Sequence, residues 1–125
     1  MATWKSFEEI EAWKESSRLV CEVYRVTREG EFSRDFALRD QIRKSAISVP
    51  SNISEGFERD STKAFINFLY IAKGSCGELR TQIYLARKLG YIDAARMKKL
   101  VAKAKDVSRM IAGLIGYLEK SMTKS

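Results

Sequence analysis

Apolar residues recur every three or four positions along four long stretches of the chain, which is the spacing of amphipathic α-helices. We therefore predict helices over about residues 6–29, 33–59, 61–89 and 93–121. The positions that this spacing turns toward a core are Phe7, Ile10, Trp13, Ser17, Val20 and Tyr24 in the first helix, Leu38, Ile42, Val49, Ile53 and Phe57 in the second, Phe65, Phe68, Ile71, Leu79, Ile83 and Ala86 in the third, and Met97, Val101, Ala104, Ile111, Leu114 and Leu118 in the fourth.

Helix-capping residues stand at the borders of these stretches. Ser6 followed by Glu9 has the sequence of a capping box, and Ser61 and Asp93 are good N-cap residues for the third and fourth helices. Because the connections are only a few residues long, successive helices must run antiparallel. The expected fold is all-α, a single domain over residues 1–125 built as an up-down-up-down antiparallel four-helix bundle.

The only proline, Pro50, lies inside the second predicted helix. A proline in a helix interior costs roughly 3 kcal/mol and leaves one backbone carbonyl, here that of Ala46, without its helical donor. Nearby serine and asparagine side chains can bond to freed backbone groups. We expect a structural motif here, and its residues are Pro50, Ser51, Asn52, Glu55 and Gly56.

Polar residues run beside the apolar stripe of the second helix, and a matching set lies on one face of the third. The first set is Gln41, Ser45, Ser48, Asn52 and Glu55, and the second is Asn67, Gly74, Ser75, Glu78 and Gln82. We expect the two sets to meet in a hydrogen-bonded network between these helices or at a subunit contact, where they would fix the register. Gly74 and Gly77 each lower helix propensity by about 1 kcal/mol, which favours close approach of another backbone. A small-molecule or catalytic pocket is the alternative interpretation.

The chain lacks residues on which much enzyme chemistry depends. It has no histidine, which removes Ser-His-Asp and Cys-His arrangements and the Glu-x-x-His pairs of di-iron bundles. Cys21 and Cys76 stand alone at apolar helical positions, so we expect two reduced core thiols. We expect no enzyme activity, no catalytic residue, no metal and no cofactor. With no signal-peptide pattern and no run of about 20 apolar residues, a cytoplasmic protein outside the membrane is favoured.

Positive charge is concentrated in one part of the chain. Eight basic residues between positions 80 and 105 are opposed only by Asp93, so this segment accounts for the whole net charge of +7. In an antiparallel bundle the segment lies at one tip, together with the turn between the first two helices, which adds Arg28, Arg34 and Arg39. The candidate nucleic-acid-binding residues are Arg39, Arg87, Lys88, Arg96, Lys98, Lys99, Lys103 and Lys105.

Several interpretations of this basic tip stay open. A positive field at one end suits a phosphate backbone, whose contacts weaken with added salt. A solvated helix face, an acidic protein partner or a membrane surface would use the same residues. No RNA-recognition, zinc-finger or basic-zipper motif is present, so sequence-specific reading of nucleic acid has no support.

Residues 48–56, Ser-Val-Pro-Ser-Asn-Ile-Ser-Glu-Gly, closely resemble a signature of the bacterial four-helix proteins encoded in 23S rRNA intervening sequences, Ser-Ile-Pro-Ser-Asn-Ile-Ala-Glu-Gly. Val49 and Ser54 are mild departures from it. The resemblance extends over nearly the whole chain. Further segments that agree in order are Phe7 with Trp13, residues 68–75, and residues 78–82 leading to residues 89–92.

That family is similar to the accessory variability determinant of diversity-generating retroelements. The resemblance implies a four-helix protomer in a homopentamer, with a basic surface that can contact RNA or DNA and a reverse transcriptase. It supplies no catalytic residues. Apolar residues beyond the main stripes of the first and fourth helices also favour an oligomer, namely Leu19, Val23, Val26, Leu100, Ile115 and Tyr117.

We therefore predict a non-catalytic, oligomeric binding or scaffold protein that contacts nucleic acid through its basic end without sequence specificity. The alternative is a protein–protein adaptor with no nucleic-acid contact. The prediction depends on topology, because Arg28 and Lys98 must lie at the same end of the molecule.

Overall fold

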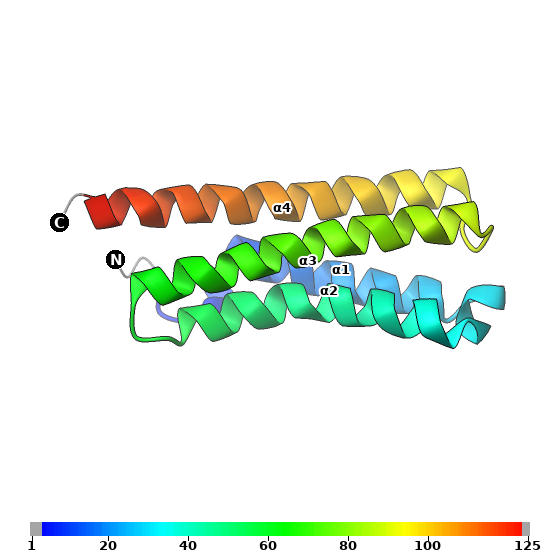
Figure 1. Ribbon diagram of the computed structural model, residues 1–125, viewed down its shortest axis with the longest axis horizontal. Helices are drawn as coiled ribbons and strands as arrows, with labels where there is room; N and C mark the ends of the chain where they lie inside the picture. Colours follow the sequence, from blue (N-terminus) through cyan, green and yellow to red (C-terminus); the bar gives the residue numbers. More distant parts are fainter. Residues whose placement is uncertain (1–3, 124–125) are drawn as a thin grey trace.

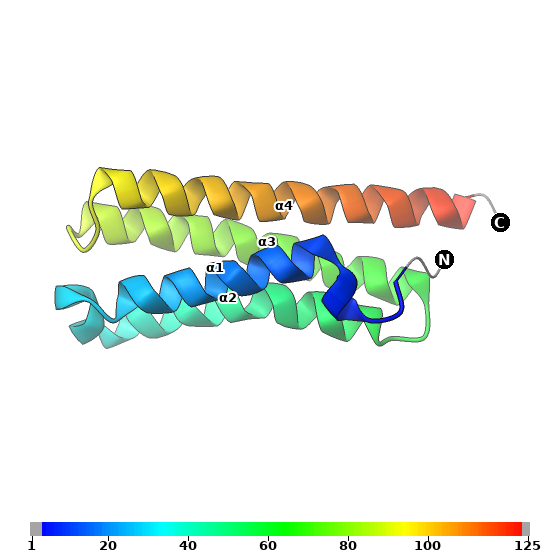
Figure 2. The same ribbon diagram turned by 180° about the vertical axis from the view of Figure 1, so that it is seen from behind.

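The computed structural model describes residues 4–123, which form four α-helices and two short 3-10 helices (Figure 1). No strand occurs within these residues. Each helix packs against its two neighbours around the ring, and successive helices run in opposite directions, as the view from behind also shows (Figure 2). The all-α, up-down-up-down bundle is confirmed. The elements in order are η1 (Phe7–Glu9), α1 (Glu11–Thr27), η2 (Gly30–Arg34), α2 (Phe36–Phe57), α3 (Thr62–Lys88) and α4 (Ala94–Thr123).

One hydrophobic core runs between the four helices. The predicted inward positions of α2 and α4 fall in it or against it, with Ile53, Ile111 and Leu118 completely buried. Each such aliphatic side chain contributes roughly 1.5–3 kcal/mol when it leaves water. Within residues 4–123 no helix is long and apolar enough to cross a membrane.

The buried face of α1 lies one position away from the predicted stripe. Leu19 and Val23 are inside the core, whereas Val20 and Tyr24 are only half-buried. Two polar residues share this face because each bonds to its own helix: Ser16 Oγ donates to the Trp13 carbonyl at 3.0 Å, and Thr27 Oγ1 donates to the Val23 carbonyl at 2.8 Å. The residues that the structure buries on α1 are Ala12, Ser16, Leu19, Val23 and Thr27.

Two further inward positions were predicted wrongly. Ile71 is 52% exposed, because Leu69 and Ala72 occupy the core side of that turn of α3. Cys21 is exposed on α1, while Cys76 is buried, so only one of the two free thiols is a core residue.

The first two helices begin later than their sequence predicted. Ser6 makes no side-chain cap, and α1 starts only after Ile10, whose extended backbone separates it from η1. This break lets Ile10 enter the core while the rings of Phe7 and Trp13 pack 5.4 Å apart. The second helix starts after Asp35, whose carboxylate accepts a bond from the Leu38 amide at 3.1 Å.

The other helix borders follow the local sequence. Ser61 Oγ accepts from the Ala64 amide at 3.1 Å, and Asp93 Oδ1 accepts from the Arg96 amide at 2.8 Å, so both predicted caps are confirmed. Gly90 follows α3 with a φ of 81°. In this left-handed conformation its amide donates to the Arg87 carbonyl at 3.0 Å, which ends the helix.

Candidate nucleic-acid interface

The turn between α1 and α2 and the turn between α3 and α4 meet at one end of the bundle (Figure 1). The Tyr91 hydroxyl donates to Asp35 Oδ2 at 2.8 Å, and the Tyr91 ring stacks on Phe32 with centroids 5.1 Å apart. Arg96 forms an ion pair with Glu29 across the same gap. The placement of the two turns at one tip, on which the basic-end prediction depended, is therefore confirmed.

The Asp35–Tyr91 contact also shifts the acidity of both groups. Hydrogen bonds from the Leu38 amide and then from Tyr91 stabilise the carboxylate and lower the pKa of Asp35. The same bond raises the pKa of Tyr91, because the neutral hydroxyl is the donor. Nearby, the hydrogen bond to Glu29 raises the pKa of Arg96. The tip is thus held by polar contacts between its two turns.

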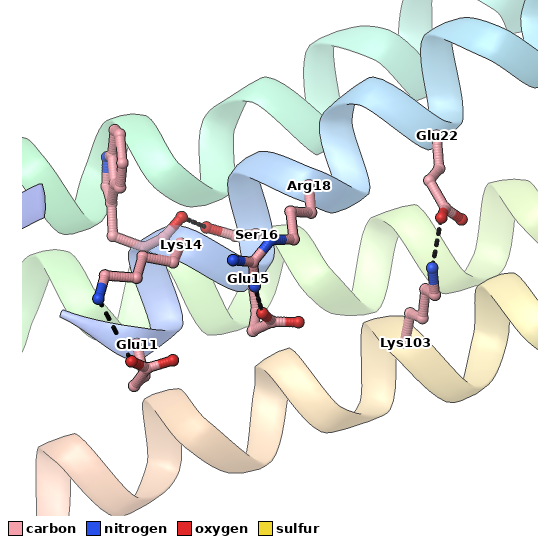
Figure 3. Close-up of polar contacts among 8 residues, drawn as sticks. Glu11, Lys14, Glu15, Ser16, Arg18, Glu22 and Lys103 are labelled. Atoms are coloured by element: carbon pink, nitrogen blue, oxygen red, sulfur yellow. Dashed lines mark hydrogen bonds and ion pairs between the residues drawn. The ribbon is translucent and has the colours of Figure 1, made fainter. Parts of the chain in front are cut away.

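Three of the eight candidate cations are neutralised within the protomer. Arg96 pairs with Glu29. Lys103 of α4 reaches across to Glu22 of α1 (Figure 3). Arg39 bonds to Asp40 at 2.9 Å. Part of the positive charge of the candidate residues is therefore neutralised by carboxylates of the same protomer.

The other five candidates keep their charge available to solvent. In residues 4–123 no carboxylate lies within ion-pair distance of them, and Arg87 makes only a 3.4 Å bond to the Ile92 carbonyl. All are exposed. These available cations are Arg87, Lys88, Lys98, Lys99 and Lys105.

Lys98 and Lys105 lie together on a shallow groove between α3 and α4. The groove has a volume of about 280 Å³ and is also lined by Tyr84, Asp106 and Arg109. Lysines seven positions apart share one face of a helix, which the sequence shows. Arg109 and Tyr84 were not predicted as residues of this surface. For Tyr84 the reason is that helical periodicity does not reveal which side chains of α3 lie beside α4.

The proline motif keeps α2 continuous rather than ending it. Pro50 lies inside the helix, and Asn52 Nδ2 donates to the Ser48 carbonyl at 2.8 Å and to Ser48 Oγ at 2.9 Å. Ser54 Oγ donates to the Ser51 carbonyl at 3.0 Å. These bonds reach carbonyls beside the proline, not that of Ala46.

The polar residues of α2 and α3 meet at the centre of the helix pair. Ser75 Oγ donates to Ser48 Oγ at 2.9 Å, so Asn52, Ser48 and Ser75 form one chain of hydrogen bonds. The predicted network does not extend to the outer members of the two sets. Glu55 is exposed and pairs with Arg59 at 2.8 Å. The other exposed members are Gln41, Asn67, Gly74 and Glu78, whereas Gln82 is half-buried with an amide oxygen that has no partner in residues 4–123.

The glycine that permits close helix packing is Gly56. A Cβ atom there would lie 2.7 Å from Phe68 Cβ and 3.2 Å from the Phe65 carbonyl oxygen. At Gly74 and Gly77 a Cβ would meet nothing within 4 Å. The close approach predicted at Gly74 and Gly77 is therefore wrong within the protomer, and it occurs in the proline motif instead.

The comparisons with known proteins agree with the four-helix fold. The family described as 23S rRNA-intervening sequence protein matches over residues 8–113. The chain belongs to this family. A similar solved structure is that of a protein of unknown function from the S23 ribosomal protein family of Bacteroides thetaiotaomicron VPI-5482, with a TM-score of 0.78. This chain is 20% identical to it, over 84% of this chain and 95% of that one, which supports the fold alone. No curated protein matches the chain.

Proposed function

We propose that this member of the family is a non-catalytic, oligomeric protein of the bacterial cytoplasm that contacts nucleic acid through its basic tip. The observation that carries the proposal is the pair Lys98 and Lys105, exposed together on one groove with no carboxylate partner in the described residues. Two free cysteines are compatible with a reducing compartment.

The tip suits a phosphate backbone better than a base-reading role. Lysines are compact point charges that attract phosphates without demanding a particular geometry. Four of the five available cations are lysines, so the contact is expected to be independent of base sequence. Lys88 ends α3 and Lys99 lies near the start of α4, so both add positive charge at the tip.

An oligomer is supported by one uncovered face of α3. We call the outer face of α3 the surface formed by Tyr70, Ile71, Gly74, Gly77 and Leu85. Its three large side chains are exposed, Ile71 by 52% and Leu85 by 43%. At Gly74 and Gly77 a Cβ atom would meet nothing within the protomer. We propose that a second copy of the chain packs on this face. Leu19, Val23, Leu100 and Ile115 no longer support an oligomer, because the protomer core buries them.

The experiment measures retention of a duplex oligonucleotide as a function of salt concentration. Replacing Lys98 and Lys105 by glutamine removes two phosphate contacts, so the log–log slope should fall by about 1.8. The matched control carries Lys63→Gln and Lys120→Gln, two exposed lysines on the same helices near the opposite end.

Equal retention by the tip variant and the control would contradict the proposed contact. If the unmodified protein retains no nucleic acid, the role of a protein–protein adaptor becomes the better-supported function.

A further inference from the structure

Two aromatic rings and two arginines lie in the seam between α1 and α2, away from the α3–α4 groove. We call the α1–α2 seam the surface formed by Tyr24 of α1 with Phe36, Arg39, Arg43 and Ile47 of α2. The positions on α2 are spaced by three or four residues, so they follow one face of that helix. Figure 2 shows α1 and α2 lying side by side along their length.

Both arginines are held in fixed positions over an aromatic ring. Arg43 Nε donates to Thr27 Oγ1 at 2.8 Å, and its guanidinium carbon lies 4.4 Å from the centroid of the Tyr24 ring. Arg39 bonds to Asp40 at 2.9 Å and to the Ser33 carbonyl at 3.0 Å, with its guanidinium carbon 4.6 Å from the Phe36 centroid. Fixed side chains lose less conformational entropy on binding than flexible ones.

The seam still has groups free to bind a ligand. Phe36 is 63% exposed although the Arg39 guanidinium lies over its ring, so most of the side chain is open to solvent. Within residues 4–123 the two Nη atoms of Arg43 make no hydrogen bond. Tyr24, Asp40, Arg43, Lys44 and Ile47 line a shallow hollow of about 330 Å³ beside it.

These groups match the chemistry of an unpaired nucleotide. A nucleobase stacks on an exposed aromatic ring, and a phosphate accepts from a fixed guanidinium. In a duplex the base faces are covered by neighbouring base pairs. A bound duplex would therefore leave the Phe36 ring exposed to water. The acidic side chains of a peptide can pair with Arg43 but have no flat ring to stack on Phe36, and Asp40 repels them and a phosphate alike.

We propose that the α1–α2 seam binds single-stranded nucleic acid by stacking an unpaired base on Phe36 and holding the adjoining phosphate with Arg43. This inference rests on the proposed function, because it assigns a strand type and a second surface to the same nucleic-acid role. The basic tip would contact phosphates of any strand, while the seam would distinguish unpaired from paired nucleotides.

The test measures fluorescence anisotropy of a labelled 12-nucleotide single strand, in RNA and DNA forms, and of a 12-base-pair duplex. Phe36→Ala should weaken single-strand binding by about 5- to 150-fold, the usual effect of losing one stacked base, and leave duplex binding unchanged. Phe36→Trp should restore single-strand binding. Arg43→Lys should weaken it while keeping the charge, because the planar fork is lost.

The matched control is Tyr117→Ala, which removes a ring that is 48% exposed on α4, outside both the seam and the outer face of α3. Thermal unfolding of each variant shows that an effect is not loss of fold. The inference would be overturned if Phe36→Ala weakened the binding of neither RNA nor DNA single strands, or weakened the binding of duplex equally. Either result is compatible with the salt-dependent contact at the tip. Absence of all nucleic-acid binding, whether or not poly-glutamate binds, would overturn it together with the proposed function.

Discussion

At the scale of single residues, Gly56 is the position where packing leaves no room for a side chain. Gly56→Ala would place a Cβ atom 2.7 Å from Phe68 Cβ, a distance that forces the helices apart. We expect the free energy of unfolding to fall by about 1–3 kcal/mol, the range for overpacked cores. Urea denaturation followed by circular dichroism measures it.

The control for this prediction is a glycine in open space. Gly113→Ala on α4 adds a Cβ that meets nothing within 4 Å, so it should raise stability by up to about 1 kcal/mol through helix propensity alone. A stabilising Gly56→Ala, or equal effects at the two positions, would show that α2 and α3 are not in the close contact described.

The sequence alone could not show which glycine is crowded by a neighbouring helix. Gly56, Gly74 and Gly77 all stand in helical patterns, and only the neighbour from another helix tells which one is crowded. The Ser48–Ser75 bond is similar, since polar periodicity predicted that the two faces meet and the structure shows which pair touches.

The two cysteines give a second prediction at this scale. Burial raises the pKa of the Cys76 thiol to about 11, whereas Cys21 lies exposed on α1. Only the thiolate reacts readily, so one thiol per chain should react with a disulfide reagent at pH 8 and two after denaturation. Cys21→Ser should abolish the fast reaction. Two fast thiols in the native protein would contradict the burial of Cys76.

At the scale of elements, the contact between Asp35 and Tyr91 joins the start of α2 to the α3–α4 turn. Its contribution to stability depends on pH in a predictable direction. The pKa of Asp35 is lowered from its ordinary value of 3.8, so the stabilisation is present above that pH and is lost as the pH falls through the lower folded value. The pKa of Tyr91 is raised from 10.0, so the stabilisation is present below that pH and is lost as the pH rises further.

Tyr91→Phe tests this contact. The variant should unfold at a lower temperature than the unmodified protein at neutral pH, and the difference should shrink as the pH falls below 3.8. Calorimetry between pH 2 and pH 7, a range of about five units, measures both melting temperatures. Tyr70→Phe, on an exposed tyrosine of α3, is the control and should have no pH-dependent effect. A constant difference across the range would mean that Asp35 is not the partner that matters.

Element borders show where sequence information is sufficient. Ser61 and Asp93 were predictable as caps, because a cap depends on residues three positions away. The break at Ile10 was not, since it depends on how Phe7 packs on Trp13. The register of α1 was missed because Val20 with Tyr24 and Leu19 with Val23 form neighbouring stripes of similar apolar character.

At the scale of the whole molecule, topology and charge were predictable but charge pairing was not. Short connections dictate antiparallel helices, and that alone brings the basic segment and the α1–α2 turn to one tip. The carboxylates that neutralise Lys103 and Arg96, namely Glu22 and Glu29, come from α1 and its following turn, far away in sequence. The candidate list therefore divides into paired and available cations only when the fold is known.

The last prediction concerns assembly through the outer face of α3. Ile71→Glu with Leu85→Glu places two charges on side chains that the protomer leaves exposed, so folding should persist while a partner copy is repelled. Native mass spectrometry should then show single chains where the unmodified protein shows five, the number that the family resemblance implies. Ile47→Glu, at an aliphatic residue 40% exposed on α2, should leave the assembly intact. Since each chain carries +7, dissociation also disperses the positive field, and the dissociated variant should bind duplex more weakly although Lys98 and Lys105 are unchanged. A monomeric unmodified protein would contradict the oligomer, and an assembly that survives both substitutions would place its interface elsewhere.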